Sequence, residues 1–327
     1  MPEGEPELTA VVVVGPLRER AGGALRSLLD QGLEGRLEVL LVDLAPAGSA
    51  PVPGSDDPVV RIVPLPVATT FAEARAHAVA LARAPAVAFV EEHVRVLRGW
   101  GEALIAAHRE PWAGIGGEAA NANPGVGTSD IAGLISYGYW YAPLARGEAD
   151  LLPGHNASFK TEVLRSYGAE LPELLVADLV LHQRLRADGH RLLLEPAARF
   201  AHLNETDWRT QARGIHLWYR CYGPLRARAG RWSRARRGFY VAAAPAIPLY
   251  FALGFGRYLR RTRPAYLRLF LAHLPYVLAV HLAAALGQAL GLLFGPGDAP
   301  RRFTRYELTA ERRTAEPRGL GATSPRA

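Results

Sequence analysis

Cysteine and lysine are almost missing from this 327-residue chain. Its single cysteine, Cys221, excludes an internal disulfide and suits a reducing compartment. Lys160 is the only lysine, so arginine carries nearly all of the positive charge behind the formal net charge of +7. This bias is a weak indication of a polyanionic partner, and we expect no nucleic acid to bind. The first residues lack the basic start and apolar stretch of a secretory signal, which favours a cytosolic catalytic region.

Asp, Glu, Lys and Arg are also absent from two stretches near the C-terminus, residues 238–256 and 269–295. Each stretch is apolar and long enough to enter or cross a bilayer. We therefore expect a membrane-associated helical hairpin over residues 226–309. The alternative is a buried helical hairpin in a soluble domain. The remaining residues, 310–327, are rich in Arg, Thr, Gly and Pro and are expected to be disordered.

Clusters of arginine flank both apolar stretches, and one of them, Arg257 to Arg263, lies between the two. If the stretches were an ordinary pair of spans, this middle cluster would lie outside, against the positive-inside rule. A re-entrant or interfacial hairpin would keep every cluster near anionic lipid on the cytosolic side.

Apolar runs alternate with helical segments in the first hundred residues. The pattern predicts strands at residues 9–14, 38–42, 59–63 and 87–90, and helices at residues 20–31 and 71–83. Alternation of this kind is typical of βαβ units with right-handed crossovers. We expect an α/β fold with a Rossmann-like, mostly parallel sheet in a domain spanning residues 8–225.

Three potential metal ligands, Glu91, Glu92 and His93, follow the last of these strands. Ligands collect at the carboxyl ends of strands in open α/β sheets. A carboxylate and an imidazole two residues apart can reach one cation from a single turn, while the residue between them points elsewhere. The competing interpretation is a solvated turn after a strand.

The order of these segments resembles a family 2 glycosyltransferase with the A-type fold. The matching text is VVVVGPLRER, then EVLLVD, then ARAHAVALARAPAVAFVEEHVRVLRGW. The resemblance implies that Asp43, at the end of the second strand, accepts hydrogen bonds from the base or ribose of a nucleotide. It also places Arg75 near the nucleotide, although a solvated helix residue remains the alternative.

The metal motif departs from the Asp-x-Asp of that family and is more similar to the Asp-x-His of the polypeptide N-acetylgalactosaminyltransferases. In those enzymes a later histidine completes the ligand set. The resemblance implies that Glu91, His93 and His202 hold Mn²⁺ or Mg²⁺, which neutralises the departing diphosphate, and imidazole ligands favour Mn²⁺. Glu92 then lies beside the ligands on the donor side or points to solvent, and a core histidine is the competing reading of His202.

The segment LLPGHNASFK resembles the Gly-His-Asn turn of the family, where backbone and an amide approach the donor sugar. Gly154 supplies a permissive backbone, and Asn156 supplies a donor and an acceptor. The alternative is an ordinary turn that caps a helix beginning near Thr161. We expect His155 to be supporting structure.

The segment from Leu174 to Glu205 resembles the acidic helix, strand and closing histidine of the family. There a carboxylate at the helix start is the general base, and Asp178 occupies that position, with Ala177 where many relatives have a second acid. The alternative is an acid that stabilises the helix N-terminus. Gln211, Arg213 and Trp218 match the Gln-x-x-Arg-Trp region of the family inexactly.

The resemblance covers residues 8 to about 220. It implies an inverting, metal-dependent glycosyltransferase of the hexosyltransferase type. Such an enzyme moves a sugar from a nucleotide-diphospho sugar to a lipid-linked or cell-envelope glycan acceptor at a membrane. Two alternatives stay open: a nucleotidyltransferase on a similar sheet, for which GPLRER is a poor phosphate loop, and a membrane-bound scaffold without catalysis.

Overall fold

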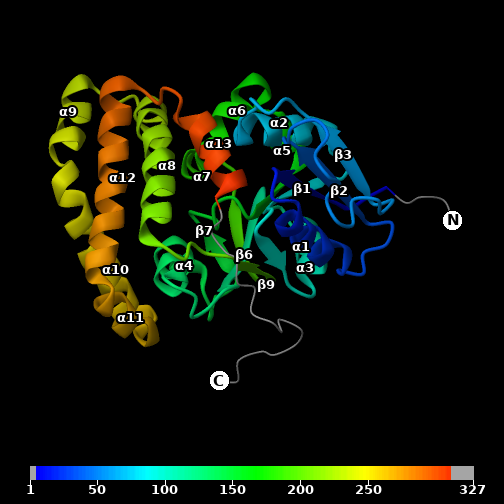
Figure 1. Cartoon of the computed structure of the whole chain (residues 1–327), viewed down its shortest axis with the longest axis horizontal. Coiled ribbons are helices and arrows are strands. Elements are labelled where there is room, and N and C mark those ends of the chain that lie inside the picture. The colour runs from blue at the N-terminus through cyan, green and yellow to red at the C-terminus, as the bar shows by residue number, and fades with distance from the viewer. Residues whose placement is uncertain (1–4, 311–327) are drawn as a thin grey trace.

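The computed structural model describes residues 5–310. Apart from Ala310, the tail predicted to be disordered lies outside the described residues. A twisted sheet and the helices that cover it form the right-hand part of Figure 1, and a layer of long helices stands at the left.

All nine strands in the described residues belong to one sheet, in the order β3-β2-β1-β4-β8-β6-β9-β5, with β7 also paired to β9. The strands are β1 Leu8–Val14, β2 Leu37–Asp43, β3 Val60–Pro64, β4 Ala86–Glu91, β5 Val94–Val96, β6 Gly114–Asn121, β7 Gly147–Ala149, β8 Ala157–Lys160 and β9 Leu192–His202. The β3-β2-β1-β4 pairs are parallel. Because β8 is antiparallel to both β4 and β6, those two strands run the same way, and β9 runs with β6. Six strands therefore share one direction against β5, β7 and β8, which confirms the predicted α/β fold with a mostly parallel sheet.

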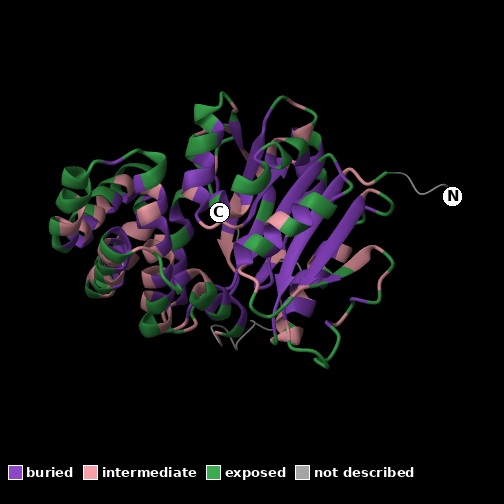
Figure 2. Cartoon of the chain, turned by 90° about the horizontal axis from the view of Figure 1, so that it is seen from above, coloured by how far each residue is buried: buried purple, intermediate pink, exposed green. Residues whose placement is uncertain are grey.

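Helices bury both faces of the sheet, as Figure 2 shows by the buried strands between partly exposed helices. Every residue of β1 is buried, and its side chains alternate between two apolar clusters. One cluster includes α1 (Arg18–Leu29) and α3 (Trp100–His108), and the other includes α2 (Phe71–Leu81) and α7 (Asp178–Ala187). A strand covered on both faces needs apolar residues at nearly every position. This requirement explains why continuous apolar runs predicted β1, β2 and β4 to within one residue at each end.

The remaining helices of the first two-thirds are short. They are α4 Ser129–Tyr137, α5 Thr161–Arg165 and α6 Leu171–Leu174, with single 3₁₀ turns η1 Gly138–Trp140 and η2 Gly168–Glu170. Helix α7 begins at Asp178, the residue expected to start the acidic helix.

The C-terminal part consists of several helices, where a simple hairpin was expected. They are α8 Trp208–Ala229, α9 Arg234–Ala242, η3 Ala244–Ala246, α10 Ile247–Thr262, η4 Pro264–Tyr266, α11 Leu267–Ala272, α12 Leu274–Phe294 and α13 Ala299–Thr309. Each apolar run is interrupted near a proline, because proline lacks the N–H that would continue the preceding helix. Pro245 lies in the break between α9 and α10, which are bent by 48°, and Pro275 lies in the first turn of α12. In the described residues α12 alone is long and apolar enough to cross a membrane, or α12 and the bent α9–α10 pair if that pair is one span.

Helices α8 and α12 pack closely along their length, side by side in Figure 1. Two glycines one turn apart on α12 allow this approach. A Cβ on Gly287 would lie 2.2 Å from the backbone oxygen of His216, and a Cβ on Gly291 would lie 2.4 Å from that of Arg220. Small residues spaced by four let two helix backbones approach in the same way at membrane interfaces. The predicted boundary between residues 225 and 226 falls inside α8, which belongs to this helical layer.

We expect Gly291→Ala to destabilise the protein, because the added methyl group must push α12 away from α8. Overpacking of this kind costs about 1–3 kcal/mol, and each kcal/mol lowers the unfolding midpoint by about 2–4 °C in a protein of this size. Gly254→Ala in α10 is the matched control, since nothing lies within 4 Å of its added Cβ. Thermal unfolding of both variants in the same detergent measures the effect, and equal midpoints would contradict close packing at Gly291.

Candidate metal and donor site

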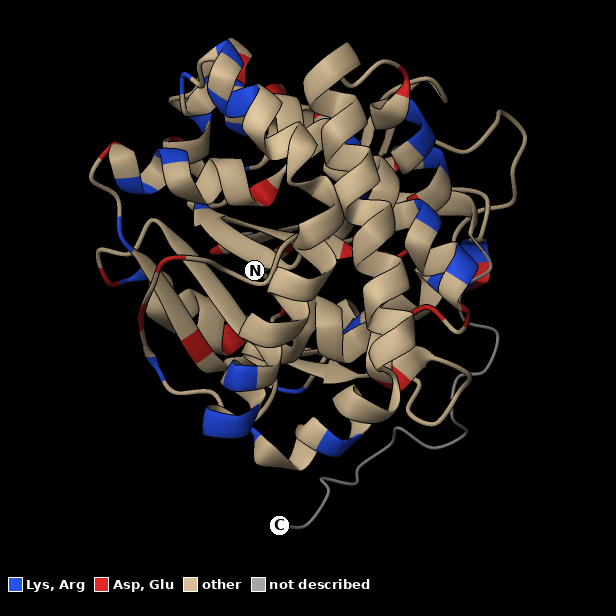
Figure 3. Cartoon of the chain, turned by 90° about the vertical axis from the view of Figure 1, so that its left-hand side faces the viewer, with Lys and Arg blue, Asp and Glu red and all other residues tan. Residues whose placement is uncertain are grey.

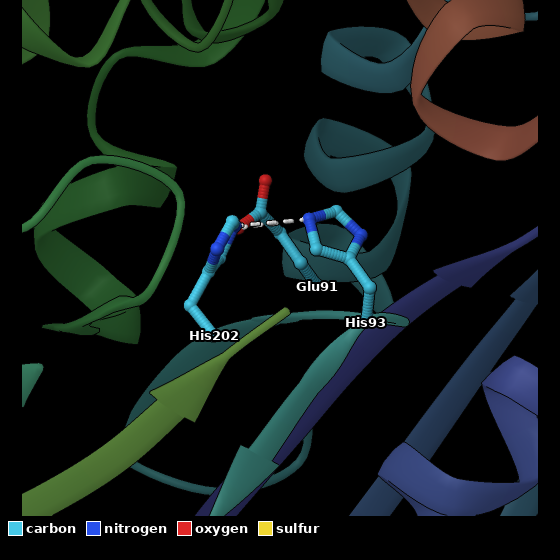
Figure 4. A group of neighbouring side chains, drawn as sticks. All are labelled: Glu91, His93 and His202. Carbon is cyan, nitrogen blue, oxygen red and sulfur yellow. Dashed lines mark hydrogen bonds and ion pairs between the residues drawn. The ribbon is translucent and has the colours of Figure 1, made fainter. Parts of the chain in front are cut away.

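Glu91, His93 and His202 lie together at the carboxyl edge of the sheet (Figure 4). Glu91 ends β4, His93 lies in the turn between β4 and β5, and His202 ends β9. The antiparallel β5–β9 register pairs Val94 with His202, which brings the two histidines beside each other. All three residues are buried.

Three ligand atoms of this group form a small triangle. The Nε2 atoms of His93 and His202 are 3.1 Å apart, and the Oε2 atom of Glu91 lies 3.7 Å and 3.5 Å from them. A circle through atoms at these separations has a radius of about 2 Å, which matches metal–nitrogen and metal–oxygen bonds of about 2.0–2.2 Å. Two imidazoles and one carboxylate can bind Mn²⁺, and three protein ligands leave coordination positions for a substrate. The group therefore fits a divalent metal.

Neighbouring polar groups orient the carboxylate of Glu91. Its Oε2 accepts hydrogen bonds from Asn156 Nδ2 at 2.7 Å and from the Tyr137 hydroxyl at 3.3 Å, and its backbone N–H donates to Asn156 Oδ1 at 3.1 Å. Burial alone would raise the pKa of Glu91, but the adjacent ring of His202 and the nearby charges of His155 and Arg75 outweigh it and lower the pKa below its usual range. Glu91 is thus ionised and available to a cation. Asn156, predicted to touch the donor sugar, also contacts the predicted metal ligand, and no local pattern in the sequence indicates this contact.

Glu92 points away from the triangle. Its carboxylate forms an ion pair with Arg20 and accepts a hydrogen bond from the backbone N–H of Gly15 at 3.2 Å. Burial raises the pKa of Glu92, and Arg20 opposes that rise. The residue is 1% exposed, so the structure contradicts the option of a solvent-facing side chain. Glu92 joins the end of β4 to the loop after β1.

Asp43 ends β2, and β1 lies between that strand and β4. Val14 of β1 is level with Asp43, and Val13 is level with Glu91, so the two carboxylates lie at the same edge of the sheet. Asp43 accepts two hydrogen bonds from Arg18, at 2.9 Å and 2.6 Å. Burial by itself would raise the pKa of Asp43, but Arg18 and the backbone N–H of Ala45 lower it. Arg18 is a neighbour of the predicted donor site that sequence reasoning missed.

The loop before β8 brings Gly154 and His155 to Asp178. Gly154 has a φ of +41°, in the region that glycine adopts without strain. Asp178 begins α7 and is buried, and its Oδ2 lies 3.4 Å from the Nε2 atom of His155. His155 therefore lies beside the predicted base, and its supporting role stays a prediction.

Arg75 is 1% exposed and is not the solvated helix residue of the alternative interpretation. Its guanidinium lies over the rings of Phe71 and Phe89, 4.3 Å and 5.0 Å from their centroids. It contacts the Nδ1 atom of His155 and donates to the backbone oxygen of that residue at 3.1 Å. Arg75 therefore packs against the loop that carries His155. Its contact with a nucleotide stays a prediction.

A cavity of about 380 Å³ lies between the metal group and Asp178. Glu91, His202, Gly154 and Asp178 all line it, so a predicted base and two predicted metal ligands face the same space. Its other walls include α4, η1, α8, α10, α12 and α13, and their aromatic side chains include Tyr139, Trp140, Trp218, Tyr219 and Phe251. The volume is within the range of small-molecule sites.

Helix α13 returns from the helical layer to the metal group. Glu307 is buried, and its Oε2 lies 4.0 Å from the Nε2 atom of His93. Arg20 donates to the backbone oxygen of Glu307 at 2.9 Å, and Tyr306 donates to Glu205 at 2.8 Å. Sequence reasoning missed Glu307, because no local pattern signals that a helix beyond the apolar runs folds back onto the sheet.

The inexact Gln-x-x-Arg-Trp region lies on α8 near the cavity. Gln211 contacts Tyr276 of α12 and donates to the backbone oxygen of Ala132 at 3.3 Å, so it joins three helices. Trp218 lines the cavity.

No family model matches this sequence, and no curated protein matches it. Among solved structures, one similar fold is that of GalNAc-T7 with UDP, GalNAc and Mn²⁺, at 12% identity and a TM-score of 0.43. That match covers 61% of this chain and 44% of the other, so this chain spans less than half of it. Another is the mannosyltransferase PcManGT from Pyrobaculum calidifontis in complex with GDP-Man and Mn²⁺, at 16% identity and a TM-score of 0.47, covering 86% of this chain and 87% of the other. Both scores are below 0.5, so the proposed activity depends on the residues of the site itself.

Proposed function

We propose that this protein is a metal-dependent glycosyltransferase with an A-type fold that uses a nucleotide-diphospho sugar. The observation that carries this proposal is the triangle of Glu91, His93 and His202 at the carboxyl edge of the sheet, facing a cavity that also contains Asp178. A bound Mn²⁺ or Mg²⁺ would neutralise the charge that grows on a departing diphosphate. Asp43 is proposed to bind the nucleoside, and the Gly154 to Asn156 turn is proposed to bind the sugar.

The proposed reaction inverts the anomeric carbon. Asp178 takes the proton from the acceptor hydroxyl as that oxygen attacks the anomeric carbon, and the sugar–phosphate bond breaks on the opposite side. The carboxylate is buried in the cavity wall and faces His155, which supports this role because a base must be held near the acceptor. No second carboxylate is needed as a nucleophile in this scheme.

A lipid-linked or cell-envelope glycan is the proposed acceptor. Its support is the aromatic wall that α8 and α10 add to the cavity, next to a helical face with exposed apolar side chains. Phe239, Tyr250, Leu253, Leu293 and Phe294 are each more than half exposed on α9, α10 and α12. Figure 3 shows the helices on this side largely free of charged residues, with arginines toward the ends and edges. An exposed apolar face of this kind is suited to a membrane.

We propose that this helical layer is held in the cytosolic membrane interface. Arg263, in the connection between α10 and η4, donates to the backbone oxygens of Tyr139 and Pro143 at 3.3 Å and 3.2 Å. Tyr139 also lines the cavity. Because this connection contacts the catalytic part, the two belong on the same side of a bilayer. That arrangement supports a monotopic or re-entrant layer over two full spans.

A cysteine placed at the exposed Arg261 tests this arrangement. We expect Arg261→Cys to resist a membrane-impermeant thiol reagent in intact cells and to react after the membrane is permeabilised. The unaltered protein is the control, because its Cys221 is 2% exposed. Efficient labelling in intact cells would contradict the cytosolic loop, and recovery in the soluble fraction without detergent would contradict membrane association.

The proposed glycosyltransferase activity is tested by identifying the reaction products. The purified protein is incubated with UDP, GDP and dTDP sugars, Mn²⁺ and a lipid-linked sugar acceptor. We expect release of a nucleoside diphosphate and an inverted linkage in the product. In a parallel incubation with nucleoside triphosphates and a sugar 1-phosphate, release of pyrophosphate would favour the nucleotidyltransferase. No product in either incubation would favour the scaffold.

A further inference from the structure

A chain of three side-chain hydrogen bonds leads from the predicted ligand His202 to a carboxylate on another element. The ring Nδ1 atom of His202 lies 2.8 Å from Asn204 Oδ1, Asn204 Nδ2 lies 2.9 Å from Asn121 Oδ1, and Asn121 Nδ2 lies 2.7 Å from Asp130 Oδ1. Asn121 ends β6, Asp130 lies in the first turn of α4, and Asn204 follows β9. None of these three residues was singled out from the sequence.

The far end of this chain fixes the orientation of Asn121. An ionised carboxylate can only accept hydrogen bonds, so the amide of Asn121 must turn its NH₂ group toward Asp130. The carbonyl of Asn121 also accepts the backbone N–H of Asn123 at 3.0 Å, and a backbone N–H can only donate. Both contacts require the same orientation of Asn121, and they require it independently.

The orientation of Asn121 determines that of Asn204, which in turn determines the tautomer of His202. Because the carbonyl of Asn121 can only accept, Asn204 must present its NH₂ group to it and its own carbonyl to His202. A carbonyl facing the Nδ1 atom requires a proton on that nitrogen. A neutral imidazole protonated at Nδ1 has its lone pair at Nε2. Nε2 is the atom that contributes to the triangle with Glu91 and His93.

We infer that Asn204, oriented by Asn121 and Asp130, is a positioning residue that holds His202 in the tautomer able to bind a divalent cation through Nε2. This inference rests on the proposed metal site and adds to it the residues that prepare one ligand. Hydrogen-bonded partners of this kind orient ligating histidines, and their loss costs about 10- to 100-fold in metal affinity.

The backbone of Asn204 is held separately. Its N–H donates to Asn123 Oδ1 at 2.8 Å, and its carbonyl accepts from Asn123 Nδ2 at 2.9 Å. Asn123 therefore anchors the loop without touching the ring of His202. Truncating Asn204 removes the contact with the ring, whereas truncating Asn123 removes two hydrogen bonds to the backbone of the same loop.

The tautomer is measured directly by heteronuclear NMR of the metal-free protein with isotope-labelled histidine, at mildly alkaline pH. His202→Gln identifies the resonances of His202. We expect the unaltered protein to carry the His202 proton on Nδ1 and Asn204→Ala to lose this preference. A proton on Nε2 in the unaltered protein would overturn the inference, whether or not metal binds.

Calorimetric titration with Mn²⁺ measures the consequence. We expect Asn204→Ala to bind Mn²⁺ about 10- to 100-fold more weakly, and Asn123→Ala to bind it as the unaltered protein does, although both variants lose stability. Equal losses in both variants, or unchanged affinity in Asn204→Ala, would overturn the inference. Failure of the unaltered protein to bind Mn²⁺ would instead contradict the proposed metal site, and the tautomer measurement would still decide the orientation of His202.

Discussion

Asp178→Asn is expected to lower turnover by about 100-fold or more while the affinity for the donor changes little. The amide keeps the size of the side chain and part of its hydrogen bonding, but it cannot take a proton from the acceptor hydroxyl. Asp178 lines the cavity, and no role other than that of the base is proposed for it. Its neighbour His155 keeps a hydrogen-bonding partner in the variant. Turnover is measured by nucleoside diphosphate release at saturating acceptor, and donor affinity by titration.

Asp188→Asn is the matched control, because the same substitution is made at the other end of the same helix. Asp188 follows α7 and pairs with Arg184 at 2.8 Å on the surface, away from the cavity. We expect this variant to keep its turnover. Near-normal turnover in Asp178→Asn would show that another group accepts the proton.

His93→Ala and His202→Ala are each expected to weaken Mn²⁺-dependent donor binding by about 100-fold or more, since loss of a direct ligand should cost at least as much as loss of a residue that orients one. Each substitution removes one corner of the triangle with Glu91. The loss should also appear in stability: Mn²⁺ should raise the unfolding midpoint of the unaltered protein and leave that of the variants unchanged, because only a protein that binds the ion is stabilised by it.

His77→Ala controls for the removal of an imidazole, because His77 is exposed on α2. This variant should respond to Mn²⁺ as the unaltered protein does. If His93→Ala kept the Mn²⁺-dependent affinity for nucleotide, the proposed ligand set would be wrong.

The parallel strands and the metal group could be predicted from the sequence because their signals are local. A strand buried on both faces is apolar at nearly every position, so the apolar run of β4 shows where the strand ends, at Glu91. The spacing of Glu91 and His93 is also local, and the resemblance to known transferases supplied His202. The triangle itself depends on the pairing of Val94 with His202, which no local pattern reveals.

The rest could not be predicted, because it depends on contacts between distant segments. Helix α13 places Glu307 beside His93, yet the sequence of this helix resembles any amphipathic surface helix. The solvated alternative for Arg75 was wrong, because packing against Phe71 and Phe89 buries its guanidinium, and neither phenylalanine is signalled by a local pattern. Amphipathic spacing shows that a helix has a buried face, and it does not show which element covers that face.

The central claim is that a divalent metal held at Glu91, His93 and His202 is required to bind a nucleotide-diphospho sugar. Calorimetric titration of the purified protein with UDP, GDP and dTDP sugars, in Mn²⁺ and again with the metal chelated, tests it most directly. We predict that at least one of these donors binds in Mn²⁺, and that its binding is lost on chelation and in His202→Ala. Binding of equal strength with and without the metal, or no binding of any donor in Mn²⁺, would contradict the claim.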